Sequence, residues 1–300
     1  MAKLLKELGF SLRVNQKKNA VSSVSPEIRD QQFVYLAGMR KSFVSRGAIV
    51  LSVDTKKKEL IGRFKNEGQA WSRAPVLVND HDFRSQADGI AIPYGIYDLQ
   101  ANRGSVVIGT SRDTPWFASD CLALWYAAEG QKRYPDTTEL LILADGGGSN
   151  RAGSYAWKYG LQTKLCNQFG LHVTVCHYPP GASKWNPIEH RLFSEISKNW
   201  AGHPLESYET VLNYIQTTTT KTGLEVTAYF LETDYEKGMK ISDEQKEKLI
   251  IAPHSVQPKR NYTLYPEQSR IFGLGEVSCQ RTSEQGSDLF IVQNPEVIFA

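Results

Sequence analysis

The stretch Glu139–Trp200 constrains the fold most, because its signals follow the order strand, glycine turn, helix, strand, loop, helix. Its first segment, Leu140–Ala144, is a short apolar run that predicts a buried strand. The run ends on Asp145, and Gly146–Gly148 then interrupt regular structure. The pattern therefore predicts a carboxylate at the carboxyl end of a buried strand.

The rest of this stretch predicts two helices around a second strand. Tyr155–Phe169 is long and mixed enough for a surface helix, and Gly170 is placed to end it. His172–His177 alternates in the manner of a strand. After a Tyr-Pro-Pro-Gly turn, Asn186 followed by Pro187 predicts an N-cap and the first residue of another helix.

Glu189 lies in the first turn of that last helix. Apolar residues at helical spacing predict the buried stripe beside it: Ile188, Leu192 and Ile196. Structural interpretations of the acids stay open, because Glu189 occupies the capping-box position after Asn186 and Asp145 can initiate a turn. Their combination favours a site, since ligands of open α/β sheets bind outside the carboxyl ends of strands.

A third acid follows the earliest strongly apolar segment. Ala48–Val53 predicts a strand that ends on Asp54. The lysines after it predict a polar turn, from which Glu59–Phe64 returns as a second strand. Lys56 and Lys57 are interpreted either as a solvated hairpin tip or as contacts to a phosphate backbone near the acid.

The remaining elements predict a mixed α/β sheet. Residues 65–103 are irregular and are interpreted as an insertion whose acids rival the three above: Asp80, Asp82, Asp88 and Asp98. Ser105–Gly109 predicts a third strand and Thr114–Gly130 a helix, with Asp113 as its cap. If the first strand pairs beside the fourth, Asp54 and Asp145 become neighbours, and the last helix brings Glu189 to them.

Composition bounds the class of protein. With 41% hydrophobic and 22% charged residues the chain is typical of a soluble globular protein, and a net charge of +3 permits a polyanionic partner without requiring one. No run approaches the roughly 18 apolar residues that cross a membrane, and no secretory signal is recognisable. The four cysteines form no CxxC pair, which favours a reducing, cytoplasmic location.

Several motifs resemble one family: VNDHDF, PYGIYDL, LILADGGGSN, HYPPGASKWNPIEHRLFSEI and TTTTKTGL. Over roughly residues 1 to 265 the chain resembles bacterial insertion-sequence transposases of the Rhodopirellula-type DDE family. The resemblance implies a ribonuclease-H-like mixed five-stranded sheet flanked by helices, with an insertion after the second strand and a C-terminal extension. It also implies that Asp54, Asp145 and Glu189 are the catalytic, metal-binding triad.

The implied activity is metal-dependent cleavage at insertion-sequence ends, followed by strand transfer through attack of a 3′-hydroxyl. Two Mg²⁺ ions, or Mn²⁺ in their place, suit a set of carboxylates, and we expect Asp54 to bridge them. The implied partner is double-stranded DNA, both ends and target, bound by a homodimer or higher oligomer. No nucleotide cofactor is expected, because the glycine turn after Asp145 lacks the Lys-Ser/Thr ending of a P-loop.

Residues that flank the acids are candidates for contacting DNA. Lys184, Trp185, His190 and Arg191 surround Glu189 in the sequence, although Trp185 is equally interpretable as a packing residue. Asn150 ends the glycine turn, whose backbone NH groups suit phosphate.

The resemblance divides the chain into four parts. Residues 1–45 are expected to be the remnant of a helix-turn-helix region plus a linker, 46–203 the catalytic core, 204–265 a C-terminal extension, and 266–300 a tail without family resemblance. The incomplete helix-turn-helix region and the tail without family resemblance predict a truncated or decayed copy. Two alternatives remain: a ribonuclease-H-like nuclease or resolvase that only hydrolyses, and an inactive DNA-binding remnant.

Overall fold

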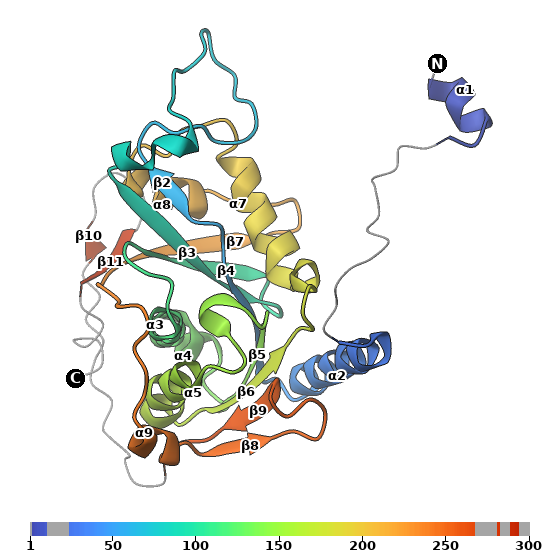
Figure 1. Ribbon diagram of the computed structural model, residues 1–300, viewed down its shortest axis with the longest axis vertical. Helices are drawn as coiled ribbons and strands as arrows, with labels where there is room; N and C mark the ends of the chain where they lie inside the picture. Colours follow the sequence, from blue (N-terminus) through green and yellow to red (C-terminus); the bar gives the residue numbers. More distant parts are fainter. Residues whose placement is uncertain (1, 11–23, 268–280, 283–288, 294–300) are drawn as a thin grey trace.

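A single mixed sheet with helices on both faces forms the centre of the protein (Figure 1). The computed structural model describes residues 2–10, 24–267, 281–282 and 289–293. In these ranges the strands are β1 (Ile49–Thr55), β2 (Glu59–Ile61), β3 (Gly89–Asp98), β4 (Arg103–Gly109), β5 (Glu139–Ala144), β6 (His172–His177), β7 (Glu225–Glu232), β8 (Ile251–Pro253), β9 (Asn261–Leu264), β10 (Arg281–Thr282) and β11 (Leu289–Gln293).

The described α-helices are α1 (Ala2–Glu7), α2 (Pro26–Ser45), α3 (Pro115–Trp125), α4 (Gln131–Arg133), α5 (Tyr155–Leu161), α6 (Asn167–Phe169), α7 (Ser194–Asn199), α8 (Tyr208–Gln216) and α9 (Asp243–Glu247). A π-helical turn joins α3 to α4 and another joins α5 to α6, so each pair forms one continuous helix. A third π-helical turn, Glu189–Phe193, precedes α7. Residues 187–199 therefore form one helix, called here the Glu189 helix.

The strand order is β10-β11-β7-β4-β3-β1-β5-β6-β9-β8. In its middle, β1, β3 and β4 are antiparallel neighbours, whereas β5 and β6 run parallel to β1. The order β4-β3-β1-β5-β6 is that of a ribonuclease-H-like sheet, as the sequence predicted. The sheet is wider than the expected five strands, because the C-terminal segments add β7 beside β4 and the β8–β9 hairpin beside β6.

Alternating side chains of β1 separate the two faces of the sheet. Leu51 and Val53 belong to a core formed with α3 and α5, whereas Val50 belongs to a second core under α2. A third core joins the Glu189 helix and α8 to β3 and β4. The predicted stripe of the Glu189 helix is confirmed, since its members are all fully buried: Ile188, Leu192 and Ile196.

The prediction that residues 65–103 are an irregular insertion was wrong for their second half. β3 lies there and is a central strand of the sheet. Pro93 and Gly95 weakened its strand signal. The NH of Lys56, the residue after the end of β1, donates to the carbonyl of Pro93. The side of Pro93 that lacks an NH therefore faces the interval between β1 and β2, and the proline is tolerated there.

The hairpin predicted after Asp54 was also wrong. β1 and β2 pair with successive parts of the same strand, since Thr55 lies opposite Tyr94 and Glu59 opposite Ala91. The chain therefore continues in one direction through the lysines rather than turning back. The insertion that remains, between β2 and β3, holds a short 3₁₀-helix over His81–Gln86.

The segments outside the predicted core extend it. α2 packs against β1 and β5, and residues 225–264 supply three strands of the sheet. Residues 11–23 and most of the predicted tail 266–300 lie outside the described residues. The described tail strands are β10 and β11, with β11 parallel to β7. None of the helices in the described ranges has the length and hydropathy needed to span a membrane.

Candidate active site

Asp54 and Asp145 leave the sheet side by side. β1 and β5 are parallel, and Val53 lies opposite Ala144 in their register. The next residue on each strand is therefore one of the two acids, and neighbouring strands are about 5 Å apart. The NH of Thr55 donates to Asp54 Oδ1 over 2.8 Å, and the NH of Gly147 donates to Asp145 Oδ1 over 3.0 Å. The turn-forming role of Asp145 thus coexists with its place beside Asp54.

The Glu189 helix is tied to β1 just before Asp54. The hydroxyl of Ser52 donates to Asn186 Oδ1 over 2.5 Å and accepts the NH of Ile188 over 3.0 Å. The amide of Asn186 also donates to the carbonyl of Val53 over 3.1 Å. The sequence predicted Asn186 as the helix cap, but its side chain bonds to the strand, and Ser52 supplies the cap instead.

Glu189 makes no capping-box bond. Its carboxylate has no hydrogen-bond or ion-pair partner within the described ranges, and it is half-buried. The NH of Asn186 donates to the carbonyl of Ser183 instead. Glu189 is therefore held by its helix alone and is available to a ligand.

Two glycines let this helix lie close to the sheet. Gly95 is opposite Asp54 in the β1–β3 register, and a Cβ there would clash with the ring of Phe193 and lie 2.8 Å from Ile188. A Cβ at Gly104 would clash with Leu192. Both glycines thus provide the close approach that brings Glu189 toward Asp54.

The acids repel one another electrostatically. Burial and the negative charge of Asp145 raise the pKa of Asp54 to about 8, with smaller contributions from Glu189 and Asp113 and an opposing one from the NH of Thr55. Burial also raises the pKa of Glu189, as Asp145 does, whereas His190 and Lys56 oppose the rise. A site that disfavours its own negative charge is suited to binding cations.

Asp113 is a fourth acid at this edge, and the sequence interpretation missed it. It was interpreted as the cap of α3, but the side chain of Thr114 caps that helix by accepting the NH of Phe117. Asp113 accepts a 3.1 Å hydrogen bond from the hydroxyl of Thr55. Asp113 stands two residues before Pro115, a position where an acid can either cap a helix or belong to a site. The sequence alone therefore did not distinguish the two roles.

The donor set fits divalent cations that prefer oxygen ligands. Within the described ranges, no three His, Cys, Asp or Glu side chains converge closely enough to enclose one ion. Asp54 and Asp145 lie side by side at this edge, and the charges of Asp145 and Glu189 both act on Asp54. These three carboxylates are the candidates for holding a cation.

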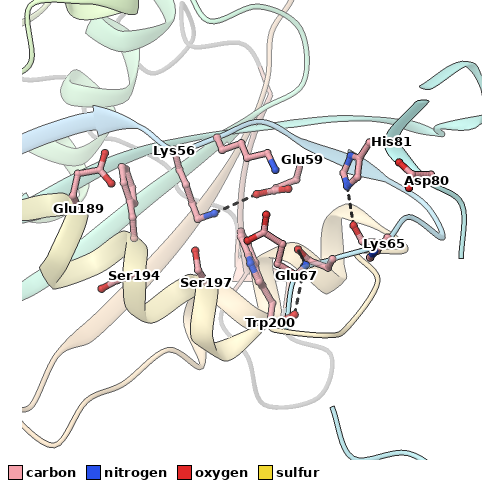
Figure 2. Close-up of a pocket in the computed structure, with 13 residues that line it drawn as sticks. Lys56, Glu59, Lys65, Glu67, Asp80, His81, Glu189, Ser194, Ser197 and Trp200 are labelled. Atoms are coloured by element: carbon pink, nitrogen blue, oxygen red, sulfur yellow. Dashed lines mark hydrogen bonds and ion pairs between the residues drawn. The ribbon is translucent and has the colours of Figure 1, made fainter. Parts of the chain in front are cut away.

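A cleft of about 590 Å³ opens beside Glu189 (Figure 2). It lies between the Glu189 helix and the segment that follows β1, and lysines and a histidine line part of it: Lys56, Lys57, Lys65 and His81. Figure 2 shows Lys56 directed toward Glu59, at 3.2 Å, and its ammonium lies 4.4 Å from the ring centre of Trp200. Glu59, Glu67 and Asp80 also line the cleft, so its charge is mixed.

The predicted DNA contacts divide into exposed and buried residues. The exposed ones surround the cleft and the start of the Glu189 helix: Lys57, Lys184, Trp185, His190 and Arg191. Lys56 is only 9% exposed and is already paired. Asn150 is 1% exposed, and its side chain accepts the hydroxyl of Tyr94 over 2.9 Å.

The rival acids do not join Asp54 at the ends of β1 and β5, although Asp80 lines the cleft beside Glu189. Asp98 is buried toward the opposite end of β1, opposite Leu51, and pairs with Arg133 at 3.2 Å. Asp80, Asp82 and Asp88 are exposed on the insertion, and none of them affects the pKa of Asp54.

The strand order defines a ribonuclease-H-like fold, in which the three acids come from β1, from the end of β5 and from the following helix. More narrowly, the chain belongs to the family described as Rhodopirellula transposase DDE domain, whose model matches residues 1–266. The resemblance drawn from the motifs is thereby confirmed. No curated protein matches the chain.

Solved structures of the Mos1 transposase are similar to this chain. A paired-end complex with the left transposon end is 16% identical with a TM-score of 0.44, and a mariner paired-end complex with Mn is 15% identical with a TM-score of 0.45. A Mos1 strand transfer complex is 15% identical with a TM-score of 0.43. Each similarity covers 71% of this chain. The chain spans 60% of the length of the two paired-end chains and 59% of the third.

Proposed function

We propose that this protein is a DNA transposase that cleaves phosphodiester bonds at the ends of an insertion sequence and joins the freed 3′-hydroxyl to target DNA. Membership of the DDE family supports the reaction class. The observation that carries the proposal is the register of β1 and β5, which sets Asp54 beside Asp145 under the helix of Glu189. The raised pKa of Asp54 is consistent with a site that needs a cation.

In this proposal Asp54, Asp145 and Glu189 would together hold the divalent cations. Bound Mg²⁺, or Mn²⁺ in its place, supplies activation of the attacking oxygen and neutralises charge on the phosphoryl group. The attacking oxygen belongs to water in cleavage and to the 3′-hydroxyl in joining, so no side chain becomes covalently modified.

DNA binding is assigned to the exposed groups around the acids. Lys57 and the residues near Glu189, namely Lys184, Trp185, His190 and Arg191, can reach a backbone that crosses the carboxyl edge of the sheet. Lys56 and Asn150 act indirectly, through Glu59 and Tyr94, by fixing the segments that follow β1 and β5. The active form is a homodimer or higher oligomer, since two ends must be held together for joining to one target.

The test is a combined cleavage and strand-transfer assay on DNA carrying the terminal repeats that flank the element. Glu189→Gln should lower both activities by more than about 100-fold, because it removes a charged metal ligand. The matched control is Glu195→Gln on the same helix, whose side chain pairs with Lys198 at 2.6 Å. The control should retain activity, and both variants should keep the melting temperature of the wild type within a few degrees.

The assay also separates the alternatives. Cleavage without joined products would contradict transposition and indicate a nuclease or resolvase. DNA binding without metal-dependent cleavage would indicate a catalytically inactive remnant. Undiminished strand transfer by Glu189→Gln would remove Glu189 from the triad.

A further inference from the structure

The β8–β9 hairpin reaches the same edge of the sheet as the triad. β9 is antiparallel to β6, with Asn261 opposite Cys176. Arg260, which precedes β9, therefore lies level with His177 at the carboxyl end of β6. Since β6 is the neighbour of β5, Arg260 lies close to the glycine turn that follows Asp145.

The backbone of Arg260 is firmly held. Its carbonyl accepts the NH of His177 over 3.2 Å and lies 2.8 Å from Nδ1 of the same residue. Its NH donates to the carbonyl of Gln257 over 2.7 Å, in a turn where Gln257 has a φ of 45°. Nε2 of His177 lies 2.9 Å from the carbonyl of Asn150, so one buried ring links the hairpin to the end of the glycine turn.

The guanidinium of Arg260 lies against the glycine turn. A Cβ at Gly146 would be 2.9 Å from Nη1, so the absence of a side chain at Gly146 makes room for the arginine. Nη1 donates to the carbonyl of Tyr178 over 3.3 Å, which sets the direction of the group. Nε and Nη2 have no partner within the described ranges, and no carboxylate there forms an ion pair with Arg260.

An arginine without a carboxylate partner, half-buried at a catalytic edge, is suited to a ligand that carries its own negative charge. Burial lowers the pKa of Arg260, yet the group stays cationic at all relevant pH values. Its free NH groups form the planar fork that matches two phosphate oxygens. A backbone phosphate of DNA is such a ligand, and it must pass this edge in the proposed reaction.

We propose that Arg260 binds a phosphate of the DNA strand next to the scissile bond, at the glycine turn that follows Asp145. This inference rests on the proposed function and adds a residue to it. The C-terminal extension thereby gains a role, because its β8–β9 hairpin brings a cation to the edge that carries the acids. The contact is to backbone and carries no base specificity.

The test compares salt dependence of DNA binding between Arg260→Gln and a matched control. A fluorescent duplex with the terminal repeat is titrated without divalent metal at several salt concentrations. Loss of one phosphate contact should lower the slope of log K against log[salt] by about 0.9. The control is Arg46→Gln, which removes the same charge at the amino end of β5, where Arg46 pairs with Glu139 at 2.9 Å. It should leave the slope unchanged.

Arg260→Lys keeps the charge and should preserve the slope while weakening binding less than Arg260→Gln. If Arg260→Gln lowers the melting temperature strongly, Gly146→Ala, which displaces the guanidinium, serves in its place. Equal slopes for the wild type, Arg260→Gln and Arg46→Gln would overturn the assignment of Arg260 while leaving the transposase proposal intact. Absence of DNA binding by the wild type itself would overturn the proposed function.

Discussion

At Asp54, burial and neighbouring acids keep a carboxyl group protonated near neutral pH, with a pKa of about 8 against 3.8 for an ordinary aspartate. The folded state therefore binds this proton more tightly than the unfolded state does. The stability that protonated Asp54 contributes is fully present below pH 3.8, and it decreases as the pH rises toward and through 8. The acid that the proposed cations need thus destabilises the metal-free protein at the pH where they bind.

We predict that Asp54→Asn stabilises the metal-free protein, and that the gain increases with pH. An amide keeps the shape of the side chain without a charge to desolvate. One pKa unit corresponds to about 1.4 kcal/mol. Because neighbouring acids share the electrostatic cost, we expect the gain in unfolding free energy to be about 2 kcal/mol larger at pH 8 than at pH 5. Urea unfolding at both pH values measures it.

The control for Asp54→Asn is Asp82→Asn, which removes the same charge from the exposed insertion and should change stability by less than about 0.5 kcal/mol at either pH. Mg²⁺ should raise the melting temperature of the wild type and of Asp82→Asn but not that of Asp54→Asn, because a ligand stabilises only the state that binds it. An equal gain at both pH values would show that the charge of Asp54 is not the cause.

Individual residues also show which features of the site the sequence predicts and which it does not. A local pattern correctly placed Asp54, Asp145 and Glu189 at element ends, because strand and helix boundaries are encoded by nearby residues. The Glu189 helix begins after Asn186 as predicted, but its capping oxygen comes from Ser52, on a strand far away in the sequence, and not from the side chain of Asn186. Contacts of this kind, like that between Thr55 and Asp113, exist only after the sheet has assembled.

Among the elements, the position of the Glu189 helix depends on the absence of a side chain at Gly95 of β3. Gly95→Ala would place a methyl group against Phe193 and Ile188. We predict that the helix shifts outward, lowering stability by about 1–3 kcal/mol and strand transfer by more than about 10-fold, because a displacement of about 1 Å at a catalytic group is costly. Urea unfolding and the strand-transfer assay measure the two effects separately.

Gly38→Ala is the matched control for Gly95→Ala. Gly38 lies in α2, where an added Cβ meets nothing within 4 Å, so alanine should stabilise the helix by about 0.5–1 kcal/mol and leave activity unchanged. Wild-type activity in Gly95→Ala would show that the close approach of the helix does not position Glu189.

β3 illustrates why one central element escaped sequence prediction. Its Pro93 and Gly95 are signals against a strand, and both are permitted by neighbours that a sequence does not reveal. Pro93 faces the interval between β1 and β2, and Gly95 faces the Glu189 helix. The apolar runs along β1 and β5, by contrast, were sufficient to predict which strands carry the acids.

For the whole molecule, α2 and β9 lie together on the sheet, although most of the matched region separates them in the sequence. α2 covers β1 and β5, and its Gln32 exchanges amide hydrogen bonds of 2.8 Å with Asn261 of β9. Gln32 also donates to the carbonyl of His177 over 2.8 Å. Residues 26–45 were predicted to belong to a separate N-terminal part, yet these contacts place α2 against the same sheet as the triad. Sequence could not indicate this, because α2 carries few buried residues: Gln32, Leu36 and Phe43.

We propose on this basis that α2 and the sheet unfold as one cooperative unit. Leu36 is 4% exposed in the core under α2, so Leu36→Ala should lower the free energy of unfolding by about 2–4 kcal/mol. Fluorescence of Trp125 and Trp157, buried on the opposite face of the sheet, should shift to lower urea together with the circular dichroism signal. Val34→Ala, at a 74% exposed position of the same helix, should change neither signal. An early loss of helix signal with an unchanged tryptophan transition would instead show that α2 unfolds independently of the sheet.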